Sequence, residues 1–178
     1  KRVVNAAFHL TRLGGSTLTP TVLEAMDEAN KSYAYMWDLI EKGGEHIAEK
    51  INAPAAWITS GAFNALVLAA AVCMVGDDPE TMRKLPHTEG MKNEFIILGN
   101  SRSTYDHAIE CAGGTRVQAG DKDGVSIQEL RDAFIPDRTA AYYYTLTPST
   151  DVPIKEFCDL AHSLGVPAIV DAAPHLTH

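Results

Sequence analysis

Short apolar runs that alternate with helical patterns constrain the fold of this chain more than any other feature. Each run has four or five residues, too few for a helix, and is bounded by polar or glycine-containing turns. The runs are Ala56–Thr59, Phe95–Leu98, Thr115–Gln118, Ala140–Tyr144 and Ala168–Asp171. Strands joined through helices form a mostly parallel sheet with helices on both faces. We therefore predict an α/β fold.

The helical patterns between these runs are marked by caps and by apolar spacing. Thr19-Pro20 and the Ser126-x-x-Glu129 capping box are typical helix starts. The longest apolar run, Ala65–Val75, has eleven residues, whereas a membrane-spanning helix needs about twenty. It is therefore predicted to be a buried helix. The predicted helices extend approximately over residues 20–29, 37–51, 60–74, 105–112, 126–134 and 153–164.

We expect one continuous unit over residues 1–178, because the chain contains no internal repeat and no linker-like stretch. A helix should follow the last strand, but the sequence given stops at His178, shortly after it. The natural polypeptide is therefore expected to continue.

The charge balance and the cysteines restrict the partners and the compartment. There are 23 acidic and 15 basic residues, a net charge of −8, and no run of five like charges, which argues against nucleic-acid binding. The N-terminal residues lack a hydrophobic signal region. The three cysteines, Cys73, Cys111 and Cys158, form no Cys-x-x-Cys motif and are expected to be reduced core thiols. A cytoplasmic protein is predicted.

The start of the long apolar helix is a candidate phosphate site. Thr59-Ser60-Gly61-Ala62 joins an apolar run to this helix, so that backbone N–H groups and the positive end of the helix dipole point toward the strand ends. A helix start with a simple glycine turn would have the same pattern. The chain contains neither a P-loop nor a Gly-x-Gly-x-x-Gly fingerprint.

Asp171 is the second candidate, because it ends a buried apolar run where ligands bind in parallel sheets. A carboxylate there is costly unless it pairs with a positive group, although it could also cap the next turn. A phosphate-type helix start together with this carboxylate suggests a ligand with a phosphate at one end and a cationic ring nitrogen at the other. Pyridoxal 5'-phosphate has these two groups.

Four stretches resemble one enzyme family: Val4–Ala7 with Leu10–Ser16, Thr59–Ala62, Tyr105–Ile109 and Val170–Ala173. They are similar to the fold-type-I pyridoxal-phosphate enzymes, and within them to the selenocysteine synthase-like group. That group includes seryl-tRNA selenium transferase and sugar-acid ammonia-lyases of the D-glucosaminate-6-phosphate type. The resemblance covers essentially all 178 residues and implies an N-terminal segment followed by an incomplete cofactor-binding large domain.

The resemblance implies a role for each matching residue. Asp171 would pair with the pyridine nitrogen, Ala173 would pack beneath the ring, and Arg12 would bind an anionic substrate group unless it is a surface arginine. The phosphate would be held by Ser60, Gly61, Ala62 and Phe63.

The chain also departs from the family pattern. The Schiff-base lysine of the family lies beyond His178, and the C-terminal small domain is likewise outside this sequence. Where relatives place a histidine over the ring, this chain has Asn100-Ser101-Arg102, which leaves Tyr105 and His107 as substitutes. Pro174 replaces a polar residue near the ring hydroxyl, a part that His175 could take.

The resemblance predicts a lyase that acts on an amino acid or amino sugar acid by α-proton abstraction and β-elimination, in at least a homodimer. Two alternatives are seryl-tRNA selenium transfer and a truncated, non-catalytic homologue that binds a phosphate ligand. Asp171, His175 and His178 have side chains of the kinds that bind metal ions. No further His, Asp or Glu follows them in the sequence given, so we do not predict a metal site.

Overall fold

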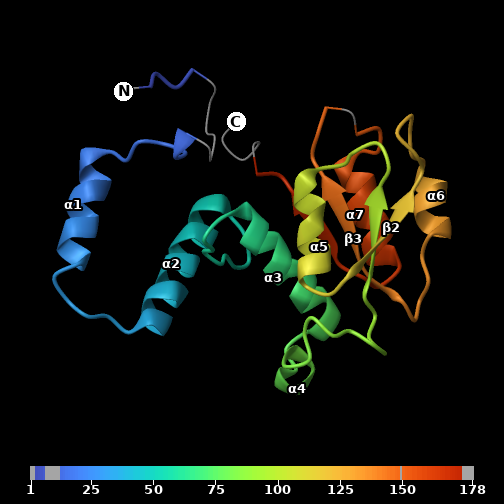
Figure 1. Cartoon of the computed structure of the whole chain (residues 1–178), viewed down its shortest axis with the longest axis horizontal. Coiled ribbons are helices and arrows are strands. Elements are labelled where there is room, and N and C mark those ends of the chain that lie inside the picture. Colours follow the sequence, from blue (N-terminus) through green and yellow to red (C-terminus); the bar gives the residue numbers. More distant parts are fainter. Residues whose placement is uncertain (1–2, 7–12, 149, 174–178) are drawn as a thin grey trace. The chain divides into compact units, whose positions relative to one another are not determined.

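The computed structural model describes residues 3–6, 13–148 and 150–173 (Figure 1). The chain divides into two compact units, Lys1–Ile58 and Thr59–His178. The assignment of all 178 residues to one incomplete domain stays a prediction. None of the described helices is long and apolar enough to cross a membrane.

The C-terminal unit is built on a four-stranded sheet in which every pair of neighbouring strands is parallel. The strand order is β2-β1-β3-β4, and each of the three connections between successive strands is a crossover that contains a helix. The strands are β1 (Glu94–Leu98), β2 (Thr115–Ala119), β3 (Thr139–Thr145) and β4 (Ala168–Asp171). The predicted α/β class is confirmed.

Helices cover both faces of this sheet (Figure 1). One face, which we call the α3 face, packs against α3 (Ala62–Val75) and α5 (Ala108–Cys111). The other, the α7 face, packs against α6 (Ile127–Asp132) and α7 (Ile154–Ser163). Successive residues of a strand point to opposite faces, so Phe95 and Ile97 enter the α3-face core and Ile96 enters the α7-face core. A strand covered on both sides has no polar alternation, which is why β1 reads as a continuous apolar run.

The N-terminal unit contains α1 (Pro20–Ala29) and α2 (Met36–Ile51), followed by an extended segment over residues 53–58. The segment lies close against α2. A Cβ added at Gly44 would clash with the carbonyl oxygen of Ala56, so only glycine permits this approach. Asn52 ends α2 in the left-handed conformation and turns the chain back along it.

The predicted strand Ala56–Thr59 is wrong. The segment pairs with none of the described strands, and the side chains of Trp57 and Ile58 are 60% and 54% exposed. An apolar run that packs on a helix has the same composition as a strand, and only a pairing partner would distinguish the two.

Three further details differ from the sequence prediction. The helix expected over Tyr105–Ala112 begins as a 3₁₀ turn, η2 (Thr104–His107), before α5. The short helix α4 (Pro79–Met82) was not predicted, although Asp78 caps it. The three cysteines are free, as expected, but Cys111 is exposed instead of lying in the core.

Candidate functional site

The start of α3 has the features of an anion-binding helix terminus. Gly61 is the residue before the helix, with φ +146°, and no described atom lies within 4 Å of the position that a Cβ would occupy there. The first turn contains no acidic residue to neutralise the helix dipole. The first N–H groups of any helix also have no partner within it. The space beside Gly61 is therefore open and electropositive.

Local hydrogen bonds fix the shape of this turn. The Thr59 hydroxyl donates to the Gly61 carbonyl oxygen at 2.9 Å, and the Ser60 hydroxyl accepts from the Asn64 amide at 2.5 Å. Side chains therefore hold the turn, while no described side chain caps the first N–H groups of α3.

The start of α3 lies near the carboxyl ends of the strands. The ring of Phe63 is 6.3 Å from the ring of Tyr105, centroid to centroid. Tyr105 belongs to η2, which follows the carboxyl end of β1 after five residues. Ligands of parallel α/β sheets bind at this edge.

Asp171 is the last residue of β4 and is buried, with 8% of its surface exposed. Its Oδ1 accepts a hydrogen bond from the Ala173 backbone N–H at 3.3 Å, a contact that a turn-capping aspartate would also make. Among the residues that the structure describes, no cation pairs with this carboxylate. A buried carboxylate without a cation is unfavourable, so the site fits a ligand that brings a positive charge.

The strand register places Asp171 on the same face as α3. Thr145 of β3 is the register partner of Asp171, and Tyr143 is the partner of Ile169. Tyr143 and Ile169 both belong to the α3-face core. Because side chains two residues apart share a face, Thr145 and Asp171 also point to the α3 face. The carboxylate and the helix start therefore share one face and one edge of the sheet.

Three further polar atoms are buried on this face without a hydrogen-bond partner among the described residues: Tyr143 OH, Thr145 Oγ1 and Asp106 Oδ1. Buried polar atoms are nearly always hydrogen-bonded in proteins. Burial raises the pKa of the Tyr143 hydroxyl, the charges of Asp171 and Asp106 raise it further, and the nearby Thr145 side chain lowers it. A polar ligand bound at this edge of the sheet could form hydrogen bonds with these three atoms, which the surrounding apolar side chains cannot provide.

The sequence analysis missed Tyr143, because it treated Tyr142, Tyr143 and Tyr144 only as part of the strand Ala140–Tyr144, which implies that all three pack in the core. That interpretation fits Tyr142 and Tyr144, whose hydroxyls donate to the carbonyls of Leu130 and Val152 on the α7 face. Tyr143 faces the other way, and the alternation of strand side chains was the signal that could have separated it.

The loop after β1 is held by its own contacts. The Ser101 hydroxyl donates to the Thr145 carbonyl oxygen and accepts from the Thr150 hydroxyl at 3.0 Å. Arg102 donates to Asp106 at 2.6 Å and to Gln118 at 3.1 Å. Ser101 and Arg102, where the resemblance led us to expect a histidine over the ring, therefore fix the loop on the sheet.

The remaining predicted site residues are only partly placed. Tyr105 is 42% exposed beside Phe63. The His107 side chain is 66% exposed, and its Nδ1 lies 3.3 Å from Glu110 Oε2. Arg12, His175 and His178 lie outside the described residues. Within the described ranges, no three His, Cys, Asp or Glu side chains form a metal-binding cluster.

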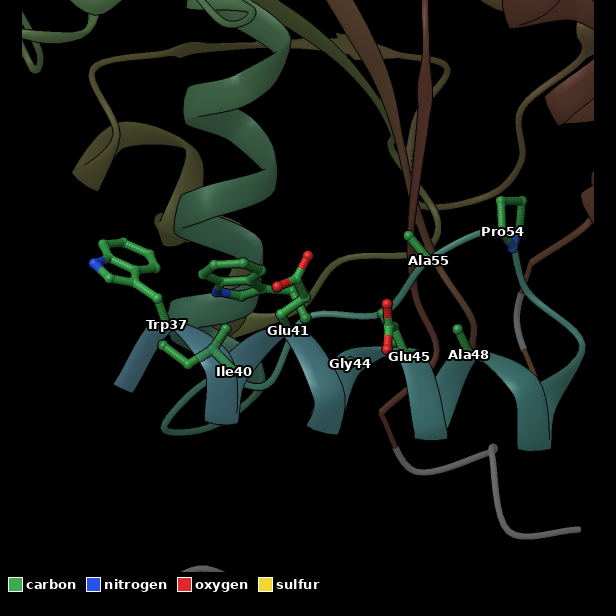
Figure 2. A pocket seen from close by; sticks show the side chains of 10 residues that line it. Trp37, Ile40, Glu41, Gly44, Glu45, Ala48, Pro54 and Ala55 are labelled. Atoms are coloured by element: carbon green, nitrogen blue, oxygen red, sulfur yellow. The ribbon is translucent and has the colours of Figure 1, made fainter. Parts of the chain in front are cut away.

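The N-terminal unit contains a separate cavity of about 510 Å³. In Figure 2, Trp37 and Ile40 line it from α2, while Pro54 and Ala55 line it from the segment that follows. None of the predicted cofactor- or substrate-binding residues that the structure describes lines this cavity.

Proteins of known activity are similar to this chain along nearly its whole length. D-glucosaminate-6-phosphate ammonia lyase of Salmonella typhimurium is 30% identical over 97% of this chain and 49% of that protein. 5'-C-glycyluridine monooxygenase-decarboxylase of a Streptomyces species is 30% identical over 96% of this chain and 45% of that protein. The chain therefore spans about half the length of these relatives. No model of a known protein family matches it.

Solved structures agree with these relatives. A structure of D-glucosaminate-6-phosphate ammonia-lyase superposes with a TM-score of 0.90 at 28% identity, covering 96% of this chain and 48% of that one. Aspartate aminotransferase of Thermotoga maritima superposes with a TM-score of 0.56 at 20% identity, covering 86% and 42%. The second likeness concerns the fold alone. All of these relatives are enzymes.

Proposed function

Because this chain is a homologue of D-glucosaminate-6-phosphate ammonia lyase with the fold of the fold-type-I pyridoxal-phosphate enzymes, we propose that it binds pyridoxal 5'-phosphate. The proposed activity is that of a lyase, which removes the α proton of an amino acid or amino sugar acid and then eliminates a group from the β carbon. The observation that carries the proposal is Asp171, a buried carboxylate without a described cation, on the face and edge where α3 begins.

The phosphate would be bound by Ser60, Gly61, Ala62 and Phe63. Backbone N–H groups at a helix start donate to phosphate oxygens, and the helix dipole favours their negative charge. The open space beside Gly61 would let the phosphate approach the backbone. Ser60 would add a hydroxyl, since its Oγ accepts from Asn64 and keeps its own proton for an anion.

Asp171 would pair with the ring nitrogen of the cofactor. When bound, pyridoxal phosphate supplies an electron sink for the carbanion that α-proton removal creates. A buried carboxylate beside the ring nitrogen raises the pKa of that nitrogen, because the opposite charge favours the protonated form. Ala173 holds Asp171 through its backbone N–H and is proposed to pack beneath the ring.

The other roles also remain proposals. Tyr105, beside Phe63, is better placed to stack on the ring than His107, which contacts Glu110. Arg12 would bind an anionic group of the substrate, and His175 would contact the ring hydroxyl. The lysine that removes the α proton is proposed to follow residue 178, in the part of the relatives that this chain does not span. The protein is further proposed to be cytoplasmic and homo-oligomeric.

Titration of the full natural chain with pyridoxal phosphate, followed by absorbance, tests the proposal. The parent protein should bind, and Gly61→Ala should bind at least about tenfold more weakly. The added methyl group enters the open space, and φ +146° strains any L residue. Gly90→Ala is the matched control, since Gly90 also has a positive φ (+81°) and open surroundings, but precedes β1 at the opposite edge of the sheet.

Two results would contradict the proposal in different ways. A parent protein that shows no binding would remove the cofactor. Equal affinity of the parent and both glycine variants would leave the cofactor but remove the start of α3 from its site.

A further inference from the structure

The proposed cofactor site explains why the Asp171 carboxylate is buried. It does not explain the buried hydroxyl of Tyr143 in the neighbouring strand β3. Tyr143 is 2% exposed, and among the described residues its hydroxyl makes no hydrogen bond of full geometry, although the Thr145 side chain lies close enough to lower its pKa. Phenylalanine would fill the same volume without leaving a buried donor unpaired. The hydroxyl therefore calls for an explanation other than packing.

The strand register places Tyr143 and Asp171 on the same face of neighbouring strands. Tyr143 stands opposite Ile169 in β3 and β4, which makes it the diagonal neighbour of Asp171 on the α3 face. Parallel strands lie about 4.8 Å apart and rise about 3.3 Å per residue, so the two Cα atoms are roughly 8 Å apart, within reach of a side chain as long as tyrosine. The charge of Asp171 also acts on the hydroxyl and raises its pKa, which agrees with this placement.

The charge of a second buried carboxylate, Asp106, also acts on the hydroxyl, but this carboxylate is already compensated. Its Oδ2 accepts from the Arg102 guanidinium at 2.6 Å and from the Ser103 backbone N–H at 3.3 Å. Asp171 has only the Ala173 N–H. The tyrosine hydroxyl has one proton to donate, and the carboxylate with fewer donors gains more from it.

We propose that Tyr143 is a positioning residue that donates its buried hydroxyl to the Asp171 carboxylate when the site is loaded. The inference rests on the proposed function. A donor to the ionised carboxylate stabilises that form over the neutral acid. The proton shared by Asp171 and the ring nitrogen would therefore stay on the nitrogen.

The test uses the full natural chain loaded with pyridoxal phosphate that carries ¹⁵N at the ring nitrogen. The ¹⁵N chemical shift reports directly whether that nitrogen is protonated. Tyr143→Phe should move the shift toward the unprotonated value, because the balance between the two proton positions changes about tenfold when a hydrogen bond to a charged group is lost. Circular dichroism checks that the variant is folded.

Tyr144→Phe is the matched control, because it removes a hydroxyl that donates to Val152 on the α7 face. Its ¹⁵N shift should equal that of the parent. If Tyr143→Phe binds the cofactor and also keeps the parental shift, the positioning role is refuted while the cofactor remains. If the parent binds no cofactor, the proposed function fails, and this inference fails with it.

Discussion

Asp171→Asn should stabilise the protein without cofactor and weaken its response to cofactor. The asparagine amide would keep an oxygen that accepts from the Ala173 N–H, so the local turn is preserved. The change removes a buried charge that has no described cation. Removing such a charge should raise the free energy of unfolding by about 2 kcal/mol.

The response to cofactor should change in the opposite direction. A ligand at one hundred times its Kd adds about 2.7 kcal/mol to the unfolding free energy. If loss of the charge pair with the ring nitrogen weakens binding about tenfold, the same concentration adds only about 1.4 kcal/mol. Without cofactor, the variant then has a larger free energy of unfolding than the parent. When cofactor binds, that free energy increases less in the variant than in the parent.

Urea unfolding with and without pyridoxal phosphate measures both effects. Far-UV circular dichroism is the appropriate signal, because it follows the helices and strands of the C-terminal unit, whereas both tryptophans of the chain, Trp37 and Trp57, belong to the N-terminal unit. A variant that is as stable as the parent when empty and gains as much from cofactor would show that Asp171 is only a turn cap.

Two other predictions concern the ion pair between Arg102 and Asp106 and the oligomeric state of the protein. Arg102→Met should lower the unfolding free energy by about 2 kcal/mol in the same urea assay, because it leaves Asp106, 1% exposed, without its cation. Lys155→Met, which breaks an exposed pair with Asp159, should have no measurable effect, and equal losses in the two variants would refute the reasoning. Light scattering of the full natural chain should show at least a dimer. A monomer that binds the cofactor fully would contradict the expected assembly.

The architecture of the C-terminal unit could be predicted from the sequence because its strands are buried on both faces. Such strands require continuous apolar runs, and β1, β3 and β4 were found from theirs. The extended segment before Thr59 shows the limit of this reasoning. It has the same apolar composition, but it packs along α2, and its conformation depends on Gly44, which allows the close approach.

The two ends of the candidate site could also be predicted, since each depends on local chemistry. Gly61 precedes a long apolar helix and Asp171 ends a buried apolar run, and these adjacent residues were sufficient to identify both as candidates. Their roles toward the cofactor stay predictions. The structure adds that both lie on the α3 face, because the strand register determines which side chains share a face.

By itself, the sequence determined the alternation of strands and helices, since apolar periodicity and caps act over a few residues. Only the tertiary structure decided what surrounds each polar group. Tyr142, Tyr143 and Tyr144 are identical side chains in succession, yet two hydroxyls bond to carbonyls on the α7 face and one is buried unpaired on the α3 face. Residues far away in the chain create that difference, because desolvation and hydrogen bonding depend on which atoms meet in space.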